Sequence, residues 1–295
     1  MTSDRRRRRG LALFFAVLLL LPSSVAGADR LSVSWRPAKP RVGDAALLQL
    51  RGAPEGATIE GMVDGRPLVF FPYADGHAAL VGFDLEAKAG SKAWQLAVLE
   101  PEHGPRTAKG NVQVLPRQFP VQRLSLPTGM VDLDPETERR AVSEGERLQM
   151  LFRSVTPQRL WRGPFTRPVG GSEAATGFGA RRIINGKPRM PHGGADYAAP
   201  TGTPVVAVNS GQVALVGDFF FPGRLVAIDH GLGLYTLYFH LDSVAVSEGD
   251  PVDRGQTIGT VGATGRATGP HLHFAAHVAG ARIDPATLLL LNPRD

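Results

Sequence analysis

The chain has 295 residues, enough for two modest domains with separate cores, and it contains no cysteine. Disulfides, thiolate metal ligands and lipid attachment at a cysteine are therefore excluded, so any metal must be held by histidine and carboxylate. The formal charge is +6, but five Arg and one Asp lie in residues 1–28, which leaves +2 for the remainder. A balance this small gives no argument for a nucleic-acid partner.

The first 28 residues have the three parts of a secretory signal peptide. A basic run from Arg5 to Arg9 precedes an apolar run from Leu11 to Leu21, and small residues follow up to Ala28, after which we predict cleavage. An apolar run of eleven residues is too short for a membrane-spanning helix, which needs about 20. We therefore expect an exported protein, periplasmic or extracellular, without a stable membrane anchor after cleavage.

Residues 29–118 are predicted to form an immunoglobulin-like β-sandwich. Short, partly alternating apolar runs are separated by turn residues, and Asp64-Gly65 is well placed for a tight turn between strands. His77 and His103 stand alone in turn-rich stretches, so we interpret them as solvated loop residues without a chemical role.

The segment at 119–163 is predicted to be a linker that contains one helix. Asp134 supplies an N-terminal cap, Pro135 suits the first helical position, and apolar residues follow at helical spacing. We expect this connecting helix at residues 135–153, weakened slightly by Gly145.

Residues 164–290 are rich in glycine and β-branched residues, and 291–295 form a tail. The short apolar runs predict a second all-β domain, one antiparallel sheet folded on itself through glycine turns. The apolar stretch Phe219 to Pro222 has two interpretations, a loop beside a binding groove or a turn packed on the domain.

Six of the eight histidines lie in the last 104 residues, where two motifs point to a metal site. His192 and Asp196 are four residues apart, so both side chains can reach the same side of the chain. His271 and His273 flank Leu272, and in a strand both imidazoles would face one way while Leu272 packs on the other face. Two adjacent imidazoles are costly as mere packing, which favours a metal or catalytic role.

Two histidines and one aspartate would give three protein ligands, which leaves the fourth tetrahedral position of a zinc ion to water. Zinc lowers the pKa of such a water to about 7 and polarises a carbonyl under attack. His240 ends an apolar strand on the face of Thr236 and Tyr238, and beside a zinc site it could move a proton or stabilise an oxyanion. His230 and His277 are placed outside the site.

The order of these motifs resembles the LytM or lysostaphin-like zinc peptidases over residues 164–290. The matching segments are Phe178–Arg181, Asn185-Gly186, His192–Asp196, Ala199–Val205, Asp229–Gly231, Tyr235–His240, Gly255-Gln256 and Gly265–Phe274. The resemblance implies that His192, Asp196 and His273 bind Zn²⁺ and that His240 and His271 are the catalytic histidines. It also implies a zinc metalloendopeptidase that cuts peptide bonds in peptidoglycan cross-links or stem peptides.

One alternative from a different class stays open, because members of this family that lost metal ligands activate other wall hydrolases. A catalytically inactive envelope regulator or adaptor would share the scaffold but would not need all five of these residues together. The cut bond, the role of the N-terminal sandwich, the oligomeric state and any self-inhibition by residues 116–190 are not decided by the sequence.

Overall fold

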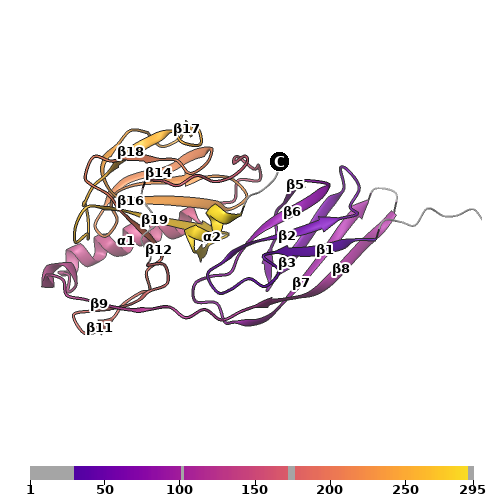
Figure 1. Ribbon diagram of the computed structural model, residues 1–295, viewed down its shortest axis with the longest axis horizontal. Helices are drawn as coiled ribbons and strands as arrows, with labels where there is room; N and C mark the ends of the chain where they lie inside the picture. Colours follow the sequence, from indigo (N-terminus) through magenta and orange to yellow (C-terminus); the bar gives the residue numbers. More distant parts are fainter. Residues whose placement is uncertain (1–29, 101–102, 172–176, 292–295) are drawn as a thin grey trace, which may run out of the picture. The chain divides into compact units, whose positions relative to one another are not determined.

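The computed structural model describes residues 30–100, 103–171 and 177–291, and the chain from Leu31 onward forms one compact unit (Figure 1). The predicted signal peptide and nearly all of the predicted tail lie outside the described residues. No helix in the described part of the chain is both long and apolar enough to cross a membrane.

The N-terminal part is a sandwich of two four-stranded antiparallel sheets, as the apolar runs predicted. The first sheet has the order β1 (Ser32–Arg36), β2 (Ala45–Arg51), β6 (Gly76–Gly82) and β5 (Phe70–Tyr73). The second has the order β4 (Arg66–Pro67), β3 (Thr58–Val63), β7 (Gly90–Glu100) and β8 (His103–Val114). Between them lies a core that includes Leu48, Leu50, Val98 and Val112.

Two local predictions in this part have different outcomes. Asp64-Gly65 makes the two-residue turn between β3 and β4, with φ of 49° and 76° as such tight turns require. His77 and His103, predicted to lie in loops, instead belong to the strands β6 and β8. That prediction was wrong because the turn residues around them occupy shorter stretches than the sequence indicated.

Strand β2 is buried on both faces, which explains why its sequence is almost continuously apolar. Leu48 and Leu50 face the sandwich core, whereas Ala45 and Leu47 join a second cluster that contains Trp161. This second cluster also holds the main core of the C-terminal part, so the two parts share buried surface. Their division into separate domains at 29–118 and 164–290 stays a prediction.

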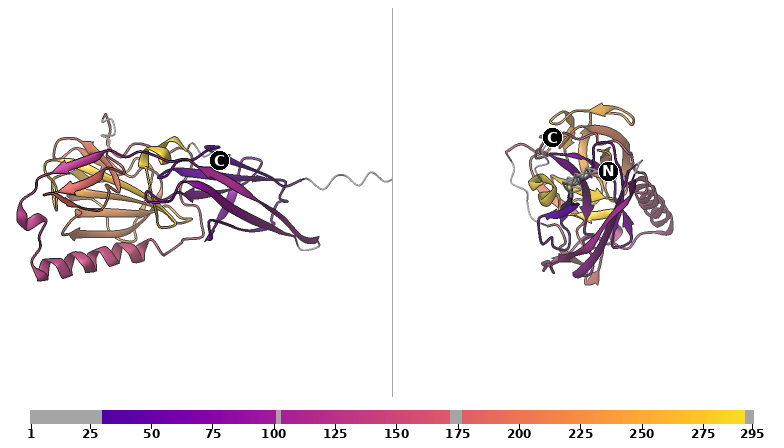
Figure 2. Two further views of the ribbon diagram at one scale, coloured as in Figure 1. Left: turned by 90° about the horizontal axis from the view of Figure 1, so that it is seen from below. Right: turned by 90° about the vertical axis from the view of Figure 1, so that its right-hand side faces the viewer.

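The connecting segment contains one long helix, α1 (Pro135–Leu151), close to the predicted range of 135–153 (Figures 1 and 2). The Asp134 carboxylate accepts hydrogen bonds from the backbone N–H groups of Glu136 and Thr137, and proline occupies the first turn. Before the helix come β9 (Val121–Leu124) and a short 3-10 turn, η1 (Thr128–Met130).

The C-terminal part is built on a nine-stranded antiparallel sheet. Its main path has the order β12 (Gly194–Ala198), β19 (His271–Val278), β16 (Leu234–Val244), β15 (Gly223–Asp229), β14 (Gly211–Phe219) and β17 (Pro251–Val252). Off this path, β18 (Thr257–Val261) pairs with β13 (Pro204–Val206) and β16, and β20 (Ala281–Ile283) pairs with β19. The other elements are β10 (Arg181–Ile184), which pairs with β9 and β11 (Lys187–Pro188), and the helix α2 (Pro285–Leu290). The predicted all-β architecture with one connecting helix is confirmed.

The two faces of this sheet have different roles. Leu272, Phe274 and other residues at alternate positions of β19 and β16 are buried in the main core. The opposite face carries Leu237 and Ala275, and Phe152 packs on it directly after the end of α1. The histidines His271 and His273 lie on this second face, beside the apolar surface that α1 covers.

His230 has a structural role in the turn between β15 and β16, away from the second face. Its side chain is fully buried, with Nδ1 2.8 Å from the Ser210 carbonyl oxygen and Nε2 2.8 Å from the Thr236 hydroxyl. The Asp229 carboxylate accepts a hydrogen bond of 2.7 Å from the backbone N–H of Gly231. The sequence prediction that His230 lies outside the site is consistent with these contacts.

Burial lowers the pKa of His230 to about 4, and this shift predicts acid sensitivity. Below pH 6.5 His230 is protonated in the unfolded chain but stays neutral in the folded protein. Protonation therefore favours the unfolded chain, and the free energy of unfolding falls by about 3 kcal/mol in total as the pH drops towards 4. We expect this effect in urea unfolding of metal-free protein, measured at several pH values between 7 and 4. His230→Gln should be less stable than the wild type at pH 7, but its free energy of unfolding should depend less on pH. Identical pH slopes for the two proteins would contradict this account.

Candidate metal centre and active site

The pairing of β12 with β19 brings the first three candidate ligands together. In this antiparallel register Asp196 is directly opposite His273. His192 precedes β12 by two residues, so the alternation of the strand turns it to the same side as Asp196. His271 lies on that side too, with Nε2 3.9 Å from Asp196 Oδ1.

Three atoms converge at this point. His192 Nε2 is 2.8 Å from His273 Nδ1, and Asp196 Oδ1 is 3.0 Å from the former and 2.9 Å from the latter. A tetrahedral zinc with bonds of 2.0–2.1 Å separates its ligand atoms by about 3.3 Å, close to these values. A single ring proton on His273 Nδ1 can serve only one of its two neighbours, whereas a cation would satisfy all three atoms. These residues fit Zn²⁺.

The protonation states suit a metal site. Burial alone would raise the pKa of the Asp196 carboxyl, but contacts with His192 and His273 outweigh burial and hold the pKa well below its usual range. Burial lowers the pKa of His273 to about 4. The site therefore contains an ionised carboxylate and a neutral His273 imidazole, which are the forms that bind metal ions.

His240 reaches this site through a β-bulge, which the sequence analysis did not foresee. Between the pairs Arg224–Leu241 and Val226–Tyr238, β16 has two residues opposite one residue of β15. His240 has a φ of 62°, and its ring centroid lies 4.8 Å from that of His271.

The prediction that His240 shares a face with Thr236 and Tyr238 was wrong. The Tyr238 side chain lies in the main core, whereas His240 lines the cleft together with His273. Strict alternation would have turned His240 into the core, and the bulge shifts it to the metal side. His240 lies beside the candidate ligands, but for a different reason from the one that the sequence suggested.

Both His240 and His271 are oriented by backbone carbonyl groups. His240 Nδ1 is 2.8 Å from the Thr264 oxygen, and His271 Nδ1 is 2.8 Å from the Gly269 oxygen. A carbonyl can only accept, so Nδ1 carries the proton in each ring and donates it. The Nε2 atoms of both rings are thereby left for chemistry, and the loop that follows β18 supplies both carbonyls.

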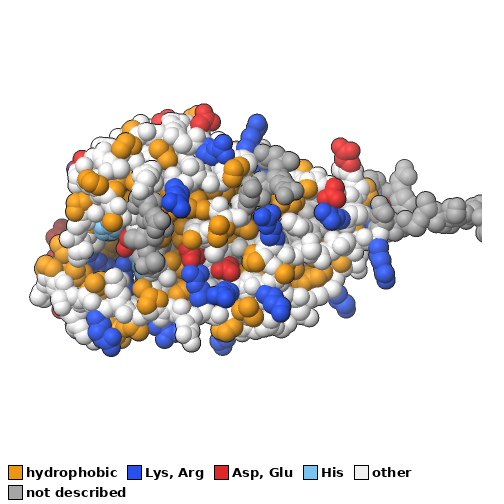
Figure 3. All heavy atoms as spheres, in the orientation of Figure 1, with side chains coloured by type: hydrophobic (Ala, Val, Ile, Leu, Met, Phe, Trp, Pro, Cys, Tyr) orange, Lys and Arg blue, Asp and Glu red, His pale blue; other side chains and the backbone are white. Residues whose placement is uncertain are grey.

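A cleft of about 440 Å³ opens in front of these residues. Its floor is apolar and includes Leu237, Phe239 and Ala275, and one wall is formed by Leu148 of α1 and by Phe152. Pale-blue histidine atoms are visible at the surface in Figure 3, close to blue Lys and Arg atoms. The hairpin residues Phe221 and Pro222 also line the cleft, whereas Phe219 is buried in the apolar cluster that contains Phe152. Each of the two interpretations of this stretch therefore describes part of it.

Sequence reasoning missed several residues that shape the site. Gly194 is packed so closely that a Cβ there would lie 2.5 Å from the Phe274 carbonyl oxygen and 2.7 Å from His273 Nε2. This close contact requires glycine at position 194. Arg182 and Arg266 also line the cleft, and no spacing rule could have joined two residues this far apart.

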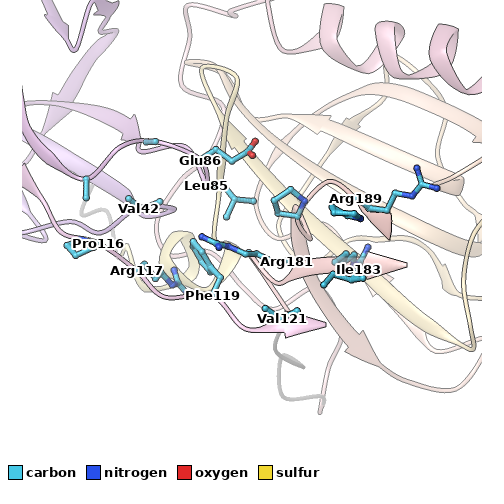
Figure 4. A pocket seen from close by; sticks show the side chains of 16 residues that line it. Val42, Leu85, Glu86, Pro116, Arg117, Phe119, Val121, Arg181, Ile183 and Arg189 are labelled. Atoms are coloured by element: carbon cyan, nitrogen blue, oxygen red, sulfur yellow. The ribbon is translucent and has the colours of Figure 1, made fainter. Parts of the chain in front are cut away.

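A second cavity, of about 740 Å³, shares Arg182 and Pro191 with the cleft but lacks its chemistry (Figure 4). Its lining includes Leu85, Phe119 and Arg181, contains no histidine among the described residues, and has Glu86 as its one acidic side chain. It is larger than the histidine-lined cleft, but its residues do not fit a metal ion.

Comparison with known proteins matches the C-terminal part to one family. Residues 190–285 match the sequence profile of peptidase family M23. The peptidoglycan DD-endopeptidase ShyA of Vibrio cholerae is 36% identical over 141 residues, which are 48% of this chain and 30% of ShyA. The DD-carboxypeptidase/endopeptidase Mpg of Neisseria meningitidis is 45% identical over 102 residues, 35% of this chain and 24% of Mpg. The chain thus spans less than a third of the length of these relatives.

A solved structure covers more of the chain. A Pseudomonas aeruginosa protein assigned to peptidase M23 is 29% identical, with a TM-score of 0.66, and the match covers 85% of this chain and 95% of that protein. A match of this extent includes more than residues 190–285, so the likeness reaches into the N-terminal sheets. Residues 190–285 thus carry the sequence features of peptidase family M23, in agreement with the LytM or lysostaphin-like resemblance of the sequence.

Proposed function

We propose that this protein is a zinc-dependent endopeptidase that hydrolyses peptide bonds in peptidoglycan. The observation that carries the proposal is the convergence of His192, Asp196 and His273, whose ligand atoms lie within 4.8 Å of one another. His240 and His271 stand beside them, each with its Nδ1 engaged by a backbone carbonyl. The peptidoglycan substrate is supported by the match to peptidase family M23 and by the activities named for ShyA and Mpg.

The five side chains divide into two groups. His192, Asp196 and His273 would hold zinc, which when bound polarises a substrate carbonyl and lowers the pKa of water to about 7. His240 and His271 present Nε2, which can accept a proton from the attacking water and return it to the amine that leaves. A protonated Nε2 also donates a hydrogen bond to the oxygen on which negative charge develops. The cleft floor would position the peptide.

The DD bond of a wall cross-link is the substrate we favour. Both relatives carry a DD-peptidase activity in their names, and the identity to Mpg is 45% over 102 residues. The alternative of an inactive wall regulator has less support, because the chain retains all five residues in one cleft or at its edge. The signal peptide predicted at residues 1–28 supports action in the cell envelope.

Zinc content and hydrolysis provide the first test. Purified residues 29–295 should bind about one zinc per chain and release DD-cleaved products from sacculi, as read by mass spectrometry. His273→Ala should lose both the metal and the activity. Well-folded protein without zinc, or an undiminished rate in His273→Ala, would refute the proposal.

The two groups of histidines should separate by metal content. His240→Asn is suited to the positive φ at this position, so the fold should be retained. It should keep zinc while its turnover falls by about 100-fold or more, since it removes a proton-transfer group rather than a ligand. Metal analysis alongside kcat distinguishes the two roles, and loss of zinc in this variant would place His240 among the ligands instead.

The close packing at Gly194 predicts a steric effect on zinc affinity. Gly194→Ala should displace His273 and weaken zinc binding by about tenfold or more, measured by competition with a chelator. Gly193→Ala is the matched control, because the nearest atom to a Cβ there is Arg282 Cδ at 4.0 Å. Equal zinc affinities for the two variants would show that Gly194 does not shape the site.

A further inference from the structure

Two arginines line the same cleft as the histidines. Arg182 is in β10, and Arg266 lies in the loop between β18 and β19, from which the Thr264 and Gly269 carbonyls come. Both side chains are half-buried. Burial lowers the pKa of each guanidinium, and at Arg266 the nearby positive charges of Arg182 and Arg189 lower it further. Positive charge is therefore concentrated beside the metal site.

The partners that hold these two arginines are neutral. The Arg266 guanidinium lies over the Phe221 ring, 4.0 Å from its centroid, and its backbone N–H donates to the Phe221 oxygen at 3.0 Å. Arg266 Nη1 makes a long contact of 3.4 Å with the Met130 oxygen. Arg182 Nε donates to Gln122 Oε1 at 3.2 Å. Each guanidinium has five N–H donors, so most remain for a ligand.

No carboxylate of the described residues forms an ion pair with either arginine, and the only carboxylate whose charge raises the pKa of Arg182 is the ligand candidate Asp196. Within the described ranges, neither Arg182 nor Arg266 has a carboxylate oxygen within 4.0 Å, and the cleft lining contains no Asp or Glu. Arg282, which also lines the cleft, differs because it pairs with Asp84 at 2.8 Å and Glu86 at 2.6 Å. Gathering half-buried cations without anions is unfavourable, and a bound anion would offset that cost.

We propose that Arg182 and Arg266 form a carboxylate subsite, which binds a free carboxylate of the substrate peptide beside the bond that is cut. This inference rests on the proposed peptidase function and names the substrate feature that the cleft selects. The planar guanidinium pairs with a carboxylate through two parallel hydrogen bonds, so the subsite would set the position of the peptide as well as bind it. The apolar floor beside it fits small aliphatic side chains of the same peptide.

The test compares two cross-linked peptides that differ only in one group. In the first, the carboxylate next to the cross-link is free, and in the second it is a carboxamide. Wild-type enzyme should cut the first with a kcat/KM at least about tenfold higher, since a charge-assisted hydrogen bond is lost on amidation. Arg182→Gln and Arg266→Gln should each reduce this preference, and the double variant should abolish it.

Two further variants control for charge and fold. Arg266→Lys should retain part of the preference, because it keeps the charge but not the paired donors. Arg254→Gln should retain all of it, because Arg254 is exposed, bonds the Pro164 oxygen and does not line the cleft. Every variant should keep the zinc content of the wild type, so that a change in preference is not a change in the metal site.

The outcomes separate this proposal from the peptidase proposal. If wild-type protein cuts both peptides equally, or if the double variant keeps the preference, the subsite is refuted while the peptidase function stands. If wild-type protein cuts neither peptide, the peptidase function fails, and calorimetric binding of the same two peptides then decides the subsite. Tighter binding of the free carboxylate, lost in the double variant, supports it, and equal affinity overturns it.

Discussion

The antiparallel pairing of β12 with β19 is the constraint on which the site depends. It sets Asp196 opposite His273, and the alternation along each strand adds His192 and His271 on the same side. A shift of one residue in this register would turn His271 and His273 into the core and Leu272 towards the cleft. The buried face prevents that shift, because Leu272 is fully buried in the main apolar cluster. Packing on one face of the sheet therefore fixes the metal geometry on the other.

The same division of faces explains how the remaining residues are placed. The cleft side of the sheet is apolar beyond the metal site, and α1 with Phe152 covers part of it. α1 itself has no fully buried residue, and Arg140 and Glu144 bind the backbone of the β14–β15 hairpin by hydrogen bonds of 3.0 and 2.7 Å. This hairpin also carries Phe221, on which Arg266 stacks. The connecting helix thus contributes to the shape of the cleft.

The sequence predicted the elements well and indicated which candidate ligands come together, because both depend on local periodicity. Alternation in the His271–His273 segment and the four-residue spacing of His192 and Asp196 follow from strand geometry alone. The direction of His240 could not be predicted in that way, since a bulge depends on the partner strand. The need for glycine at 194 likewise arises from the Phe274 carbonyl, which only the paired register brings near. Both features depend on tertiary contacts, which the residue types alone do not reveal.

The charged residues of the cleft also come from different elements of the fold. The candidate metal ligands include one carboxylate, Asp196, which is in contact with His192 and His273. It is therefore not an ion-pair partner for the arginines. Arg182 and Arg266 add positive charge and form no ion pair within the described residues, and a zinc ion would add more. Repulsion between like charges is stronger at half-buried positions than in bulk water. A peptide that brings its own carboxylate lowers this repulsion as it binds, so the charge that makes the empty cleft unfavourable becomes a source of selectivity.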